Sequence, residues 1–105
     1  IFTLGYINLR GNYMAKVIIK VRVAYPSNLI KVFDSQASVR ESSGERSSSV
    51  CFLPEDPNVT FFILDWKHVE EAKIFWASKS AINQMAQWHS VGSPEILFLE
   101  EFRQQ

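Results

Sequence analysis

The sequence predicts an α+β fold in which helices cover one face of an antiparallel sheet. The first observation is an apolar run, Val59 to Trp66, that leads directly into an amphipathic segment, Val69 to Trp76. The second is the alternation of polar and apolar residues from Lys16 to Val23, which is typical of a strand with one covered face. A third strand-like stretch, Pro94 to Glu101, follows.

Length and composition favour one globular domain. A chain of 105 residues is too short for two hydrophobic cores, and 47% hydrophobic residues exclude general disorder. The regular pattern begins at Met14, so we expect a single domain over residues 14–105 and an extension over residues 1–13. In this extension Phe2, Leu4 and Tyr6 suit an added strand.

Charge and cysteine content exclude several classes of function. The 11 basic and 11 acidic residues give a net charge of +0, so no nucleic acid or anionic membrane partner is expected. Phe61 to Leu64 is as long as any uninterrupted apolar run in the chain, and it is too short to cross a bilayer. Cys51 is the single cysteine, which fits a reducing cytoplasm, and its apolar neighbours predict a buried thiol.

The first strand is followed by a helix. Tyr25-Pro26-Ser27 ends the strand, because proline removes a ladder donor, and Ser27 is the expected helix cap. Leu29, Phe33 and Ala37 recur at helical spacing, and Gly44 is the expected left-handed stop.

A polar loop, residues 42–49, then leads into two strands. Residues 50–53 form the first, a hairpin follows at 54–58, and Val59 to Trp66 returns. The return strand is continuously apolar, which indicates that both of its faces are covered.

The second helical region has two parts. Val69, Ala72 and Trp76 share one face, a break falls at residues 77–78, and Ile82 and Met85 share a face of the next helix. The resulting order, β-α-β-β-α(α)-β, is the ferredoxin-like pattern. Its helices cover one sheet face only, and we expect a homodimer in which the second faces pack together.

Two phrases carry a resemblance to a known family. These are the strand and helix that run from Trp66 into Val69-Glu70-Glu71-Ala72 and Phe75-Trp76, and the closing stretch Val91-Gly92-Ser93-Pro94-Glu95-Ile96-Leu97-Phe98-Leu99. From Met14 to Phe102 the chain resembles the antibiotic-biosynthesis-monooxygenase-like branch of the dimeric α+β barrels. The resemblance implies a small pocket between sheet and helices, and relatives that include cofactor-free oxygenases, haem-degrading monooxygenases and lactone isomerases.

The chain departs from the haem-degrading relatives, so we expect no cofactor. Trp76 matches their tryptophan, but Ala86 stands at the place of the ligand histidine, and residues 14–24 contain no asparagine. Gln36 lies about where many relatives carry a histidine, and an amide cannot accept a proton at neutral pH. Two distant histidines and one cysteine give no spacing for a metal site.

The pocket candidates are side chains near the expected gap between helices and sheet. They are Trp76, Tyr25, Arg40, Gln36, His68 and Trp66. Four of them have a structural alternative: Trp66 and Trp76, with Trp88, as core residues, His68 as an imperfect helix cap, and Arg40 as a complement to the helix dipole. His89 also suits a helix end. No catalytic residue is assigned.

Two functions stay open. The first is a cofactor-independent monooxygenase or related isomerase acting on a small aromatic or quinone-like molecule, positioned by Trp76, Tyr25 and Arg40. The second is a non-catalytic homodimer that binds a small apolar ligand or a partner. Family resemblance favours the first function, and the small number of acid–base groups favours the second.

Overall fold

The computed structural model describes residues 14–101. The helices and strands follow in the order β1 (Met14–Arg22), α2 (Pro26–Ser35), α3 (Ala37–Ser43), β2 (Glu45–Leu53), β3 (Asp56–Trp66), α4 (Val69–Trp76), α5 (Lys79–Ala86) and β4 (Glu95–Glu101). The expected extension over residues 1–13, with its added strand, lies outside the described residues. None of the helices within 14–101 has the length and apolar character needed to cross a bilayer.

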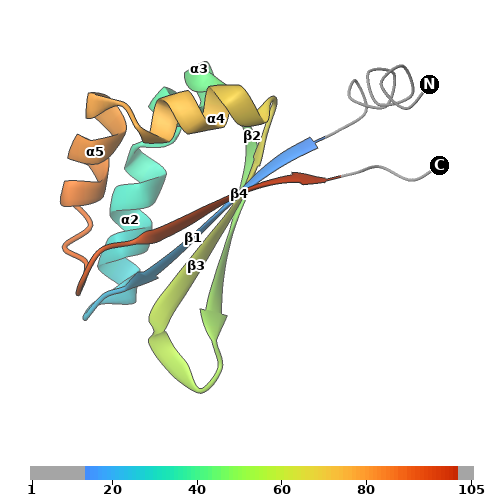
Figure 1. The fold of residues 1–105 in the computed structure, drawn as a ribbon. Helices are drawn as coiled ribbons and strands as arrows, with labels where there is room; N and C mark the ends of the chain where they lie inside the picture. Colours follow the sequence, from blue (N-terminus) through green and yellow to red (C-terminus); the bar gives the residue numbers. More distant parts are fainter. Residues whose placement is uncertain (1–13, 102–105) are drawn as a thin grey trace, which may run out of the picture.

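The four strands form one antiparallel sheet in the order β2-β3-β1-β4. The four helices lie on one side of this sheet, as Figure 1 shows. In the register, Val17 of β1 lies opposite Leu64 of β3 and Phe98 of β4. The predicted α+β, ferredoxin-like arrangement is therefore confirmed.

The covered sheet face packs against a layer of aromatic side chains. Val17, Ile19 and Val21 of β1 are buried on this face. Above them the ring of Phe33 stacks on that of Phe62, with centroids 3.9 Å apart and planes inclined by 7°. The core cluster continues through Trp66, Phe75, Trp76 and Trp88. These aromatic side chains thus join helices to sheet.

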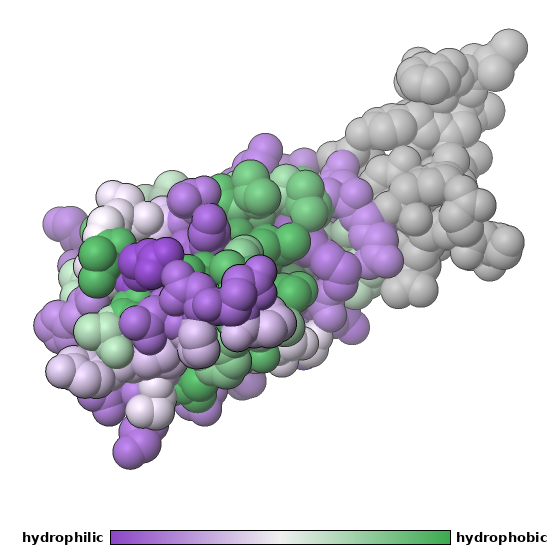
Figure 2. All heavy atoms as spheres, turned by 90° about the horizontal axis from the view of Figure 1, so that it is seen from below, coloured by the Kyte–Doolittle hydropathy of each residue, from purple (hydrophilic) through white to green (hydrophobic). Residues whose placement is uncertain are grey.

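The opposite sheet face is uncovered in the described chain. An apolar row crosses it, because Leu97 of β4 and Ile63 of β3 both lie opposite Ile18 of β1, and Leu97 is 59% exposed. Lys16, on the same face, forms ion pairs with Asp65 and, at 3.7 Å, with Glu101. Seen from the side away from α3 and α4, apolar groups lie among hydrophilic ones (Figure 2).

Two expected helix positions are corrected. Ser27 does not cap α2, because the cap is Tyr25 and Pro26 is the first helical residue, where its missing N–H is no loss. Ile82 is 54% exposed, whereas Met85 packs against the core. The buried positions of α5 are Ala81 and Gln84, so Ile82 and Met85 do not share a buried face.

Two strand predictions are also corrected. The polar residues from Glu45 onward belong to β2 and not to a loop, because pairing with β3 satisfies their backbone. Cys51 is exposed. It lies opposite Phe61, which itself lies opposite Lys20, so its side chain is on the uncovered face of an edge strand.

Candidate functional site

A cavity of about 350 Å³ lies between the end of β1, the start of α2 and the segment after α5. Its volume falls in the range of small-ligand sites. The lining residues are Val23, Ala24, Tyr25, Asn28, Leu29, Val32, Gln87, Trp88 and His89. Backbone hydrogen bonds hold both sides: Val91 N–H donates to Arg22 O at 2.7 Å, and Val23 N–H donates to Asn58 O at 3.0 Å.

The polar groups of this cavity lie around an apolar wall. Leu29 and Trp88 are buried, at 2% and 3% exposure, and form part of this wall. Tyr25 is 71% exposed and lies at the rim, where it also caps α2. His89 is exposed and has a positive φ of 54°. Tyr25 and His89 are the titratable residues among those that line the cavity. This arrangement suits a flat apolar molecule with one or two oxygen atoms.

Gln36 is hydrogen-bonded to Trp88 and fixes the position of this indole in the cavity wall. It lies at the break between α2 and α3, is 8% exposed, and accepts a hydrogen bond from Trp88 Nε1 at 3.1 Å. Its amide nitrogen donates to Gln84 O at 3.3 Å. Gln36 does not line the cavity, but it fixes a residue that does.

Arg40 is buried and forms an ion pair, whereas a residue that only complements the helix dipole would be exposed at the helix end. Its Nε donates to Glu45 Oε2 at 2.9 Å, and its Nη1 donates to Phe33 O at 2.8 Å. The guanidinium also lies 3.6 Å above the Phe33 ring. Burial raises the pKa of Glu45, while the Arg40 charge acts in the opposite direction. The structure places Arg40 in a structural ion pair away from the cavity.

The remaining sequence candidates also lie elsewhere. Trp66 is fully buried and donates from Nε1 to Ser43 O at 3.3 Å. Trp76 is 4% exposed and packs against Phe75, Trp66 and Trp88. The expectation that Trp76 lines an open pocket is therefore wrong for this cavity, since small neighbours such as Ala72 are supplemented by other aromatic rings. His68 is exposed and caps α4 without a side-chain hydrogen bond.

Sequence reasoning thus identified Tyr25 as a lining residue and missed Asn28, Gln87, Trp88 and His89 as parts of one site. What these residues share in the sequence is that each lies near the end of a helix. The segment between α5 and β4 lies beside the end of β1, because Val91 N–H donates to Arg22 O, and this brings Trp88 and His89 to the cavity at the start of α2.

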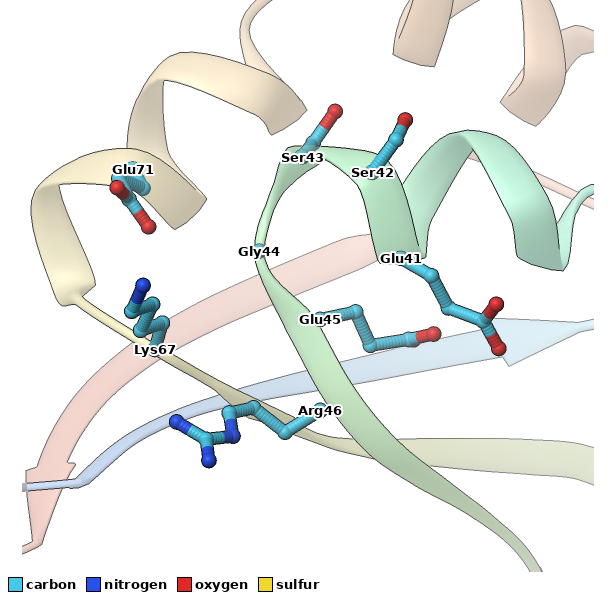
Figure 3. Close-up of a pocket in the computed structure, with 8 residues that line it drawn as sticks. All are labelled: Glu41, Ser42, Ser43, Gly44, Glu45, Arg46, Lys67 and Glu71. Carbon is cyan, nitrogen blue, oxygen red and sulfur yellow. The ribbon is translucent and has the colours of Figure 1, made fainter.

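Two other cavities carry less specific chemistry. One, of about 430 Å³, surrounds the turn from α3 into β2, with Lys67 and Glu71 on its other side (Figure 3). Its walls mix both charges, and within residues 14–101 no group of His, Cys, Asp or Glu side chains is arranged to hold a metal. The other, of about 410 Å³, lies between α3 and α4 and includes exposed Ile74.

Comparison with protein-family models and with curated proteins finds no match. Solved structures do match. A putative antibiotic biosynthesis monooxygenase from Caulobacter crescentus superposes with a TM-score of 0.69 at 17% identity, covering 94% of this chain and 99% of that one. SnoaB, a cofactor-independent oxygenase from Streptomyces nogalater, gives 0.66 at 15% identity, covering 89% and 95%.

The chain has the fold of the antibiotic biosynthesis monooxygenases. A putative member from Bordetella bronchiseptica agrees, with a TM-score of 0.62 at 16% identity over 84% of this chain and 96% of that one. The predicted resemblance is confirmed at the level of fold. At these identities the likeness concerns fold alone, since one fold supports many activities.

Proposed function

We propose that this protein is a cofactor-independent monooxygenase, or a related isomerase, acting on a small aromatic or quinone-like molecule in the cavity beside Trp88. The observation that carries the proposal is the composition of that cavity: apolar walls and an indole, with Tyr25 and His89 as groups that can exchange a proton. SnoaB, which shares the fold, is a cofactor-independent oxygenase.

For this oxygenation the protein needs only to bind the ligand and to transfer a proton. An aromatic ligand is expected to pack on Trp88 and direct an oxygen atom toward Asn28, Gln87 or His89. Removing a ligand proton makes the ring electron-rich enough to reduce molecular oxygen. One oxygen atom then enters the substrate and the other leaves as water, and the substrate supplies all the electrons.

A second function, non-catalytic binding of a small apolar ligand, has its own support. Gln36 cannot accept a proton at neutral pH, and its amide is occupied by Trp88 and Gln84. Arg40 is occupied by Glu45. Neither side chain lines the cavity, so neither is expected to take part in proton transfer.

The proposal includes a homodimer that forms through the uncovered sheet face. An apolar row with charged neighbours is a pattern that supports association, and Leu97, Ile18 and Ile63 provide it. We place the protein in the cytoplasm, because a single cysteine suits a reducing compartment.

Thermal unfolding in the presence of a panel of quinols and flavonoids tests the function, with oxygen uptake measured for each compound that binds. A ligand at 100 times its dissociation constant stabilises the folded state by about 2.7 kcal/mol. Stabilisation together with oxygen uptake or an isomerised product supports the enzyme. Stabilisation with unchanged ligand supports the binding protein. A panel without any stabilising compound would contradict both.

A further inference from the structure

We infer that His89 is the catalytic residue of this cavity, the group that takes a proton from a hydroxyl-bearing aromatic ligand. The inference rests on the proposed ligand cavity and adds to it the residue and the ligand class, an ionisable phenol. His89 was not a pocket candidate in the sequence, where its position at a helix end was the favoured explanation.

The backbone at His89 is the first observation. Within residues 14–101, His89 is the non-glycine residue with a positive φ, 54°. Glycine or asparagine would adopt this left-handed conformation at lower cost. A residue held in such a conformation at a cavity is a reason to look for function. The turn is fixed on its far side, because Ser90 Oγ donates to Gly92 O at 2.7 Å and Val91 N–H donates to Arg22 O.

The surroundings of the imidazole are the second observation. Among residues 14–101, no charged side chain lines the cavity, and Tyr25 is the other titratable group there. Arg22 of β1 is paired with Asp56 at 3.0 Å, and neither Lys31 of α2 nor Glu95 of β4 lines the cavity. The counter-ion of an imidazolium formed at His89 would therefore be the deprotonated ligand.

The proton transfer follows from this pairing. The O–H bond of the ligand breaks, its electron pair stays on the oxygen, and the proton bonds to an imidazole nitrogen of His89. Imidazole is the side chain suited to this exchange near neutral pH. The resulting phenolate and imidazolium form a charge-assisted hydrogen bond, whose strength is limited by water because His89 is exposed. On release of the ligand the proton returns.

Titration with 4-nitrophenol tests the step, because its phenolate absorbs visible light and its neutral form does not. At a pH where most of the free probe is neutral, binding to the wild-type protein should increase the phenolate absorbance. 4-Nitroanisole, which has no acidic proton, provides the comparison. His89→Asn keeps a residue that tolerates positive φ, and it should abolish the increase and weaken 4-nitrophenol binding about tenfold. Binding of 4-nitroanisole should stay unchanged.

Two further variants keep the result interpretable. His89→Gly removes the backbone strain and should be at least as stable as the wild type, yet it should also lose the phenolate signal. His68→Asn changes the other histidine, exposed at the start of α4, and should behave as the wild type. If the wild type binds both probes equally well, and His89→Asn does the same, then the proton-transfer role of His89 is wrong while the cavity proposal stands. If neither probe binds, the ligand cavity itself is wrong.

Discussion

Trp88 and Gln36 are separated by 52 residues in the sequence and joined by a hydrogen bond of 3.1 Å from the indole Nε1 to the amide oxygen. The bond ties the wall of the cavity to the break between α2 and α3. Gln36 also receives support from α5 through its bond to Gln84 O. The shape of the cavity therefore depends on a residue that never touches its contents.

Replacing Gln36 should affect both stability and binding. Gln36→Leu leaves the buried indole N–H of Trp88 without its partner, which should lower the free energy of unfolding by about 1–3 kcal/mol. Trp88 then has more than one position, so aromatic ligands should bind more weakly. Chemical denaturation and ligand titration measure the two effects. Ser35→Ala, which removes a neighbouring exposed hydrogen bond, should change stability by less than about 0.5 kcal/mol.

Arg40 and Glu45 should prove essential to the fold. Their side chains are 1% and 3% exposed, so Arg40→Met leaves a buried carboxylate unpaired and should cost about 3–5 kcal/mol at neutral pH. Arg40→Met/Glu45→Leu, which removes both charges, should recover much of that loss.

The Arg40→Met variant should also show a defined pH dependence. Without Arg40, burial and the nearby Glu41 charge both raise the folded-state pKa of Glu45 further above the unfolded value. Because the folded state then binds the Glu45 proton more tightly, the stability of the variant relative to the wild type should be greatest below the unfolded pKa of Glu45 and fall as the pH rises through the folded pKa. Urea denaturation across pH measures this. A loss of stability independent of pH would show that the ion pair is not its cause.

Gly44 is needed for both its conformation and its lack of a side chain. Its φ is +127°, and an added Cβ would lie 2.7 Å from Trp66 Nε1 and 2.9 Å from Glu71 Oε1. Gly44→Ala should therefore cost about 2–4 kcal/mol, from strain and overpacking together. Gly92 is the matched control, since it has a φ of +79° and nothing within 4 Å. Gly92→Ala should cost only about 1 kcal/mol. Equal losses in thermal unfolding would contradict the crowding at Gly44.

The uncovered sheet face should control association. Leu97→Glu puts a charge into the apolar row beside Ile18 and should weaken the dimer by at least about tenfold. Ile74→Glu, at a residue of α4 that is 72% exposed, should leave association unchanged. Light scattering over a range of concentrations distinguishes the variants, and a wild-type monomer at micromolar concentration would remove this part of the account.

The fold could be predicted from the sequence because the spacing of apolar residues identifies the strands and helices. The alternation through β1 and the continuous apolar character of β3 place Val17, Ile19 and Phe62 in the core, as expected. Edge strand β2 was only partly predicted, since its serines have no apolar pattern and depend on pairing with β3.

The site was less predictable because it depends on where element ends meet. The distance in sequence between Tyr25 and His89 carries no sign that both line one cavity. Trp76 and Arg40 were assigned to a pocket from residue type, and packing uses both elsewhere. Residue chemistry alone does not distinguish an indole in the core from one beside a ligand.

The most direct test of the central claim is binding of 1-naphthol, a simple bicyclic phenol, to variants that fill one cavity or another. Ala24 lines the cavity beside Trp88 and is exposed, whereas Ser80 lines the cavity between α3 and α4. Isothermal titration should show binding to the wild type and to Ser80→Trp, and loss of binding in Ala24→Trp with stability preserved. Undiminished binding to Ala24→Trp, or its loss only in Ser80→Trp, would contradict the assignment of the site.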